Sequence, residues 1–131
     1  MPVRPAPRLI ILGLALACGL TPALAKTSSK PDPYIADGAA VDCISINQIR
    51  SSNVRDDRTI DFEVSGKKIY RNILPNSCPS LGFERRFAYR TSVSQLCSVD
   101  IITVLTSGGP GLQRGASCGL GKFQPMVKAP K

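Results

Sequence analysis

The sequence predicts an all-β fold, a small antiparallel barrel or rolled sheet of about five to six strands that is stapled by two disulfides. Three features lead to this prediction: short runs in which apolar and polar residues alternate, breaks rich in Gly and Pro between them, and no sustained helical period. The chain has 131 residues, of which 43% are hydrophobic and 20% charged, as in a packed globular domain. Once an export signal is removed, this length suffices for one domain, which excludes a two-domain enzyme.

Residues 1–25 have the three parts of a secretory signal peptide: a basic start, an apolar run at 9–17 and a small-residue cleavage site at 23–25. Cleavage before Lys26 would leave the mature protein periplasmic or secreted. The apolar run is too short to span a bilayer of about 30 Å, and no later stretch is long enough, so no membrane span is expected. A less favoured alternative is a lipid anchor on Cys18, because its surroundings resemble a bacterial lipoprotein signal.

Four cysteines follow the signal peptide, and an even number in an oxidising compartment predicts two disulfides. They are Cys43, Cys78, Cys97 and Cys118. They are separated by 34, 18 and 20 residues, unlike the close pairs of zinc sites, so neither a metal nor another cofactor is expected. Three pairings are open, and we favour the nested one, Cys78 with Cys97 and Cys43 with Cys118.

Residues 26–40 are rich in polar residues and Pro, which predicts a flexible leader. It precedes a single β domain at 41–124 and a basic tail at 125–131. Near alternation at 43–49 predicts a first strand with a bulge toward its end.

The run at 59–64 alternates without a break and predicts a half-buried antiparallel strand. Phe62 would face the core and Asp61 the solvent. A short break containing Gly then predicts a hairpin that leads into a third strand at 67–74.

The second half of the domain continues in short strands. A loop at 75–80 is expected to be rigid, because it contains two prolines and a cysteine. Strands are expected at 85–91 and, as the most buried one, at 96–105. Glycines at 107–111 would end that strand, and 119–123 would form a last turn or short strand.

The chain has no His, which removes the usual triad base and the commonest metal ligand. Asp61 and Glu63 would lie about 7 Å apart on one strand face, a spacing compatible with paired-acid hydrolysis. That face is the solvent face of an ordinary amphipathic strand. Glycines at 108–111 and 119–122 lack the full spacing of a phosphate-binding loop. We therefore assign no catalytic residue and do not expect an enzyme.

Two charged residues, Arg71 and Asp100, lie in predicted strands whose neighbours look buried, so each needs a polar partner. They could pair with each other. Alternatively, Arg71 reaches a rim while Asp100 accepts backbone N–H groups. Tyr70, Arg71 and Asn72 could also line a small polar pocket at the mouth of a barrel, although a structural role is favoured.

The chain carries a formal net charge of +8, and its basic residues cluster in the middle of the sequence. We expect one basic face formed by Lys67, Lys68, Arg71, Arg85, Arg86 and Arg90. Since the protein is expected outside the cytoplasm, anionic envelope lipid, polysaccharide or an acidic protein is the expected partner rather than nucleic acid. Charge that serves only solubility is an equal alternative.

Several short motifs occur together between positions 42 and 123. They are Asp42-Cys43-Ile44-Ser45, Ile69 to Pro75 followed by Cys78-Pro79, Phe87-Ala88-Tyr89, Leu96 to Asp100, and Cys118 to Phe123. With its four-cysteine frame, this set resembles a family of short exported proteins of Gram-negative bacteria that is classed as a domain of unknown function. The resemblance implies export and disulfide bonds, and it carries no activity or catalytic residue over to this chain.

Together these features predict an exported binding or structural module of the cell envelope that binds anionic material through its basic face. One alternative is a proteinaceous inhibitor of a secreted hydrolase, which would present the rigid loop at 75–81 to an enzyme cleft. A carboxylate-based hydrolase is the least favoured function. The sequence does not indicate an oligomeric state.

Overall fold

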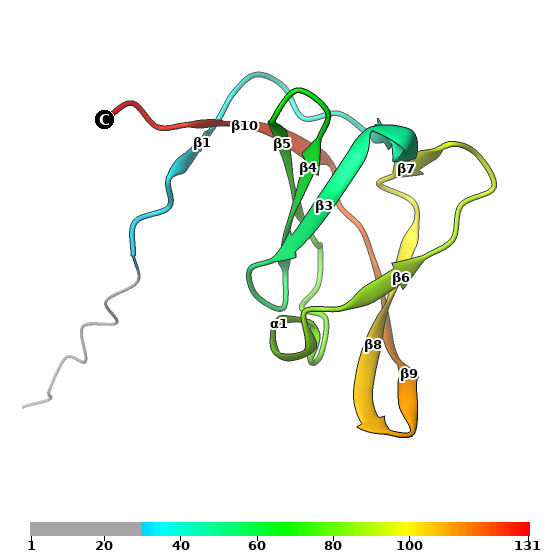
Figure 1. Cartoon of the computed structure of the whole chain (residues 1–131). Coiled ribbons are helices and arrows are strands. Elements are labelled where there is room, and N and C mark those ends of the chain that lie inside the picture. Colours follow the sequence, from blue (N-terminus) through cyan, green and yellow to red (C-terminus); the bar gives the residue numbers. More distant parts are fainter. Residues whose placement is uncertain (1–29) are drawn as a thin grey trace, which may run out of the picture. The chain divides into compact units, whose positions relative to one another are not determined.

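Ten β-strands and two short helical turns make up residues 30–131, the part of the chain that the computed structural model describes (Figure 1). The strands are β1 (Tyr34–Ala36), β2 (Cys43–Ser45), β3 (Ile49–Val54), β4 (Thr59–Val64), β5 (Lys68–Ile73), β6 (Phe87–Tyr89), β7 (Gln95–Cys97), β8 (Ile101–Gly109), β9 (Gly111–Gly119) and β10 (Phe123–Lys128). The helical turns are η1 (Ile46–Gln48) and α1 (Leu81–Glu84). The predicted signal peptide and Cys18 lie outside the described residues. No helix in the described part is long and apolar enough to cross a membrane.

All strand pairs are antiparallel, and they form three sheets. The largest has the strand order β1-β10-β5-β4-β3, a second consists of β2 and β7, and the third has the order β6-β8-β9. This confirms the prediction of an all-β antiparallel fold. Within residues 30–131 the sheets do not close into a barrel, so the rolled-sheet alternative describes the fold better.

The strands are more numerous than expected, because one predicted run is divided in two and other strands, β3 and β9 among them, were not predicted. The run predicted as one strand at 96–105 is broken after β7 by a turn in which Asp100 accepts a hydrogen bond from the Cys97 backbone N–H at 2.7 Å. The glycines at 107–111 form the tip of a β8–β9 hairpin rather than the end of the sheet. Strand β9 was not predicted, since its side chains are almost all exposed or only partly buried and show no buried apolar stripe.

The β4–β5 hairpin supplies the centre of the core, as its alternation predicts. Ile60 and Phe62 are fully buried, and a tight turn with left-handed backbone at Gly66 and Lys67 leads into β5. The Phe62 ring makes edge contacts with Phe87 and Phe123, with centroids 6.1 and 5.7 Å apart. The contact with Phe87 joins the five-stranded sheet to the three-stranded sheet across one core.

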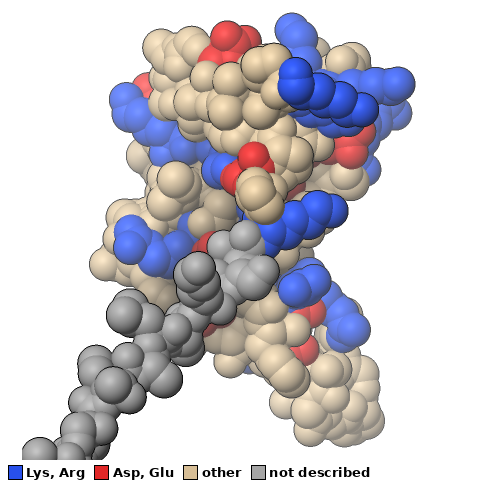
Figure 2. Space-filling model, turned by 90° about the vertical axis from the view of Figure 1, so that its left-hand side faces the viewer, with Lys and Arg blue, Asp and Glu red and all other residues tan. Residues whose placement is uncertain are grey.

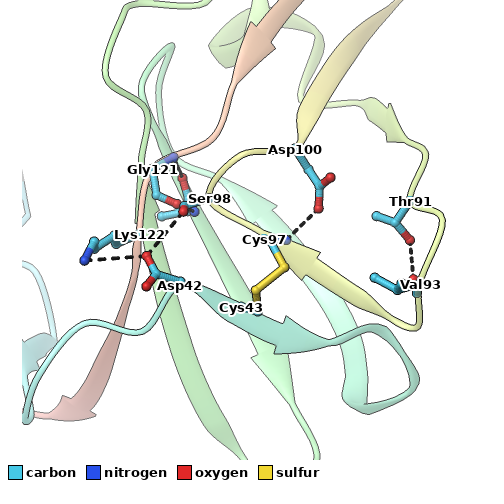
Figure 3. The surroundings of a disulfide bond; sticks show 10 residues. Asp42, Cys43, Thr91, Val93, Cys97, Ser98, Asp100, Gly121 and Lys122 are labelled. Atoms are coloured by element: carbon cyan, nitrogen blue, oxygen red, sulfur yellow. Dashed lines mark hydrogen bonds and ion pairs between the residues drawn. A yellow bond between two sulfur atoms is a disulfide. The ribbon is translucent and has the colours of Figure 1, made fainter.

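The presence of two disulfides is confirmed, but the nested pairing is wrong. Cys43 is bonded to Cys97, and Cys78 is bonded to Cys118. Figure 3 shows the first bond, which joins β2 to β7 where the two cysteines face each other in the strand register. The spacing of the cysteines in the sequence does not reveal which strands pair, so it could not predict this register and favoured a different disulfide pairing.

Both ends of the described chain contain a strand that the sequence did not predict. The predicted leader at 26–40 includes β1, which pairs with β10 along Tyr34 to Ala36. Most of the predicted basic tail at 125–131 belongs to β10. Within the described part of the leader, residues 34–36 therefore form an edge strand of the five-stranded sheet.

Candidate functional site

A cleft of about 540 Å³ lies on the outer face of the three-stranded sheet β6-β8-β9 and is also lined by the turn between β7 and β8. The register places Ala88, Thr103 and Ser117 side by side across the sheet. Their small side chains form the floor of the cleft. The opposite face of β8 carries Ile102 and Val104, which are fully buried in the core.

A second row across this sheet is basic and apolar. The Arg86 carbonyl accepts a hydrogen bond from the Leu105 N–H at 3.0 Å, and Leu105 lies opposite Arg114 in the register. Leu105 and Arg114 line one end of the cleft. Arg90 lines the cleft next to Tyr89, the residue that pairs with Ile102. The outer face thus carries three arginines, two at one end and one at the other.

These arginines differ from Arg55 and Arg71, which are held in ion pairs. Within residues 30–131, Arg86, Arg90 and Arg114 form no salt bridge. Beside them, Val99 and Ile101 are 86% and 57% exposed. Guanidinium groups that are held in no salt bridge, next to apolar side chains, are suited to bind a ligand with an anionic and an apolar part.

A second polar cluster lies on the outer face of the five-stranded sheet and is closed. The Arg71 guanidinium binds Asp61 through Nε and Nη2, at 2.7 and 2.9 Å, and its Nη1 and Nη2 bind Asp32. Arg55 contacts both carboxylates, at 2.9 Å from Asp61 and 3.4 Å from Asp32. Two arginines and two aspartates therefore neutralise each other.

Two ions of this cluster, Asp32 and Arg71, have perturbed pKa values. The hydrogen bond from Arg71 lowers the pKa of Asp32 below its ordinary value. The hydrogen bond to Asp61 raises the pKa of Arg71 above its already high value. Both groups are therefore charged throughout the neutral range.

The prediction that Asp61 faces solvent is wrong, although its strand alternates as expected. Asp61 lies on the outer face of β4, yet it is only 6% exposed, because Arg55 and Arg71 cover it. Glu63, on the same face, is exposed and accepts a hydrogen bond from the Ser51 hydroxyl. Since Asp61 is engaged by two guanidinium groups, this pair of acids does not form an open hydrolytic site.

The predicted pocket of Tyr70, Arg71 and Asn72 is not formed, since strand alternation sends Arg71 to the opposite face from the other two. Asn72 is fully buried, and its side-chain amide donates to the Gly121 carbonyl and accepts from the Gly121 N–H. A Cβ atom at Gly121 would lie 2.1 Å from the Ile73 carbonyl oxygen. This contact requires glycine and explains one member of the predicted glycine cluster.

Arg71 and Asp100 do not pair with each other. Asp100 accepts the Cys97 N–H, as Figure 3 shows, while Arg71 pairs with aspartates of β4 and of the leader. In the described part of the chain, no group of His, Cys, Asp and Glu side chains could hold a metal ion.

The six predicted basic residues do not gather on one face. Lys67 and Lys68 lie at the β4–β5 turn (Figure 1). Helix α1 lies at the other end of β4, where the Gly82 N–H donates a hydrogen bond to Asp57 in the β3–β4 loop. Arg85 and Arg86 follow α1. On the side that Figure 2 shows, Lys and Arg side chains form several groups with acidic residues between them.

Of the predicted set, only Arg86 and Arg90 belong to the outer face of the three-stranded sheet. Arg114 was missed, because its strand has no buried apolar stripe from which sequence reasoning could have recognised it. Val99 and Ile101 were expected in a buried strand, so their exposure was also missed. The sequence signal that could have indicated this exposure is that the hydrophobic segment begins at a turn.

Comparisons with known proteins identify no relative: the sequence matches no protein-family model, and neither a curated protein nor a solved structure is significantly similar to it.

Proposed function

We propose that this protein is an exported, non-catalytic binding module of the cell envelope that binds anionic lipid surfaces through the outer face of the β6-β8-β9 sheet. The observation that carries the proposal is that three arginines on that face form no salt bridge within residues 30–131 and lie beside exposed apolar side chains. Exposed Arg side chains concentrate anions near a surface, and apolar neighbours favour a ligand that also offers an apolar environment.

Export is supported by the cysteines. All four cysteines of the described chain are used in disulfides, which persist in oxidising compartments and are rare in the cytosol. A periplasmic or secreted location after signal-peptide cleavage is therefore part of the proposal. There the abundant polyanions are lipid headgroups and polysaccharides.

Lipid is favoured over polysaccharide because the face is not purely basic. Val99, Ile101 and Leu112 are each more than half exposed. The hairpin tip from Thr106 to Gln113 contains no charged residue, and Figure 2 shows an uncharged protrusion at the bottom of the molecule, where Figure 1 places this tip. Apolar side chains gain more free energy from contact with acyl chains than from a hydrated sugar polymer, because acyl chains cover more apolar surface.

The experiment is retention of the mature, disulfide-intact protein on vesicles of phosphatidylglycerol and phosphatidylcholine, compared with phosphatidylcholine alone, from low to high salt. The test variant is Arg86→Glu with Arg90→Glu. The matched control is Lys67→Glu with Lys68→Glu, which changes the net charge by the same amount at the opposite end of β4. Screening over about 8 Å at physiological salt means that binding should weaken steeply as salt rises.

We expect the arginine variant to lose most of its retention on anionic vesicles and the lysine variant to lose much less. If both variants lose retention equally, net charge rather than this face is responsible. Equal retention of the parent on both kinds of vesicle would show that the arginines serve only solubility.

A second candidate function, inhibition of a secreted hydrolase, is favoured by one observation on α1. Phe83 is 86% exposed on a four-residue helix between Ser80 and Arg85, both of which have left-handed backbone. Leu81 and Cys78 anchor this segment in the core, and the Cys78–Cys118 bond fixes its base. A rigid loop that presents an exposed aromatic side chain can enter a partner's pocket. Loss of inhibition of a periplasmic hydrolase in Phe83→Ala, with unchanged vesicle retention, would support this function.

A further inference from the structure

We infer that the cleft on the outer face of β6-β8-β9 binds a single-chain anionic amphiphile, with its phosphate or carboxylate at Arg114 and its alkyl chain against Val99 and Ile101. The inference deepens the proposed function, since it assigns a molecular ligand to the same face. A volume of about 540 Å³ is within the range of small-molecule sites.

The two ends of the cleft differ in charge. Arg90 shares its end with Asp100, whose carboxylate also lines the cleft and accepts the Cys97 N–H. The field of Asp100 opposes that of Arg90 for an incoming anion. At the other end, no carboxylate lines the cleft beside Arg114 and Leu105. An anionic headgroup is therefore more stable at Arg114 than at Arg90.

The apolar side chains are at the end where the headgroup is disfavoured. Val99 and Ile101 flank Asp100 in sequence, and both line the cleft while remaining largely exposed. A hydrocarbon chain laid over them would remove apolar surface from water on both partners. Leu105 continues this apolar surface toward Arg114.

The floor explains why the cleft is hollow. Ala88, Thr103 and Ser117 are small, and the Thr103 and Ser117 hydroxyls are 3.0 Å apart and hydrogen-bond each other. Because this bond occupies one of the two O–H donors and one acceptor, an alkyl chain that crosses the floor leaves only the second hydroxyl proton to find a partner. Ala88 is exposed, so a larger side chain there would fill the cleft without entering the core.

The experiment measures binding by calorimetry and by amide chemical shifts, with decyl phosphate below its micelle concentration, decanol and inorganic phosphate as probes. We expect decyl phosphate to bind at least about tenfold more tightly than either other probe, because only it offers both parts. Inorganic phosphate binding as tightly as decyl phosphate would overturn the inference and leave a simple anion site.

Four variants test the orientation. Arg114→Gln should weaken decyl phosphate binding about tenfold or more, and Arg90→Gln by less than about threefold. Val99→Ser with Ile101→Ser should remove the advantage over inorganic phosphate, and Ala88→Leu should abolish binding of the amphiphile. Equal effects of the two arginine variants, or full binding by Ala88→Leu, would overturn the assignment.

The vesicle assay keeps this inference separate from the proposed function. Ala88→Leu leaves Arg86, Arg90 and Arg114 in place, so this variant should still be retained on anionic vesicles but should no longer bind decyl phosphate. If decyl phosphate binds as expected but anionic vesicles do not, the cleft assignment is supported and the lipid-surface proposal fails. If the protein binds anionic vesicles but not decyl phosphate, the lipid-surface proposal is supported and the cleft assignment fails.

Discussion

Replacing Asp61 by Ala should destabilise the fold strongly, although simple alternation on β4 would place this residue at a tolerant surface position. Asp61 accepts three hydrogen bonds from Arg71 and Arg55, at 2.7, 2.9 and 2.9 Å. Removing one partner of a buried ion pair costs about 3–5 kcal/mol, since the remaining charge stays desolvated. The Arg71 side chain is 11% exposed but keeps Asp32, and Arg55 is 30% exposed, so we expect the lower end, about 3 kcal/mol.

The assay is urea unfolding followed by circular dichroism with the disulfides intact, analysed as a two-state transition. Glu63→Ala is the matched control, because Glu63 is exposed on the same strand face and should change the free energy of unfolding by less than about 0.5 kcal/mol. Adding Arg71→Leu to Asp61→Ala removes the guanidinium that has lost its Asp61 partner, so the double variant should be less destabilised than the sum of the two single ones. A loss within about 0.5 kcal/mol for Asp61→Ala, or strict additivity, would refute this reasoning.

Three further predictions concern the fold. Phe62→Ala should cost about 3–5 kcal/mol in urea unfolding, because the fully buried ring contacts two other phenylalanines; a cost below about 1 kcal/mol would contradict the core assignment. Peptide mapping without reduction should link Cys43 to Cys97 and Cys78 to Cys118, and Cys97→Ser should cost about 2–5 kcal/mol; a peptide linking Cys78 to Cys97 would contradict the structure. Because Arg71 lowers the pKa of Asp32, the stability that this carboxylate adds is present above about pH 4 and is lost as the pH falls below it. Asp32→Asn should thus be less stable than the parent at pH 7 and equally stable near pH 2, and a difference that persists in acid would exclude the ion pair as its source.

The strand pattern of the core could be predicted because it is local. Ile60, Phe62 and Val64 alternate with polar residues, and all three are buried. The alternation of apolar and polar residues along β4 does not show which residues cover the opposite face of the strand. Asp61 is buried there by Arg55 and Arg71, which come from the β3–β4 loop and β5. Both arginines also bind Asp32, which lies well before them in the sequence.

The disulfide pairing and the candidate site depend on contacts between distant segments. The β2–β7 register that sets Cys43 opposite Cys97 is formed across a separation of 54 residues. Arg114 lies opposite Leu105 because β8 and β9 pair as a hairpin across the glycines at 107–111. The sequence indicated a turn at these glycines but not the strand that follows it. The sequence alone could assign Arg86 to the exposed face of its strand. That Arg86 and Arg114 lie in the same row across the sheet could be learned only from the strand register in the structure.

The most direct test of the proposed function is to locate the lipid contact by NMR, with the isotope-labelled mature protein and anionic bicelles that carry a paramagnetic headgroup. The proposal predicts strong broadening of amides at 86–90, 99–105 and 112–117, with little change at the β4–β5 turn. Broadening centred on Lys67 and Lys68, or spread evenly over all basic residues, would contradict the claim that the outer face of the β6-β8-β9 sheet is the binding surface.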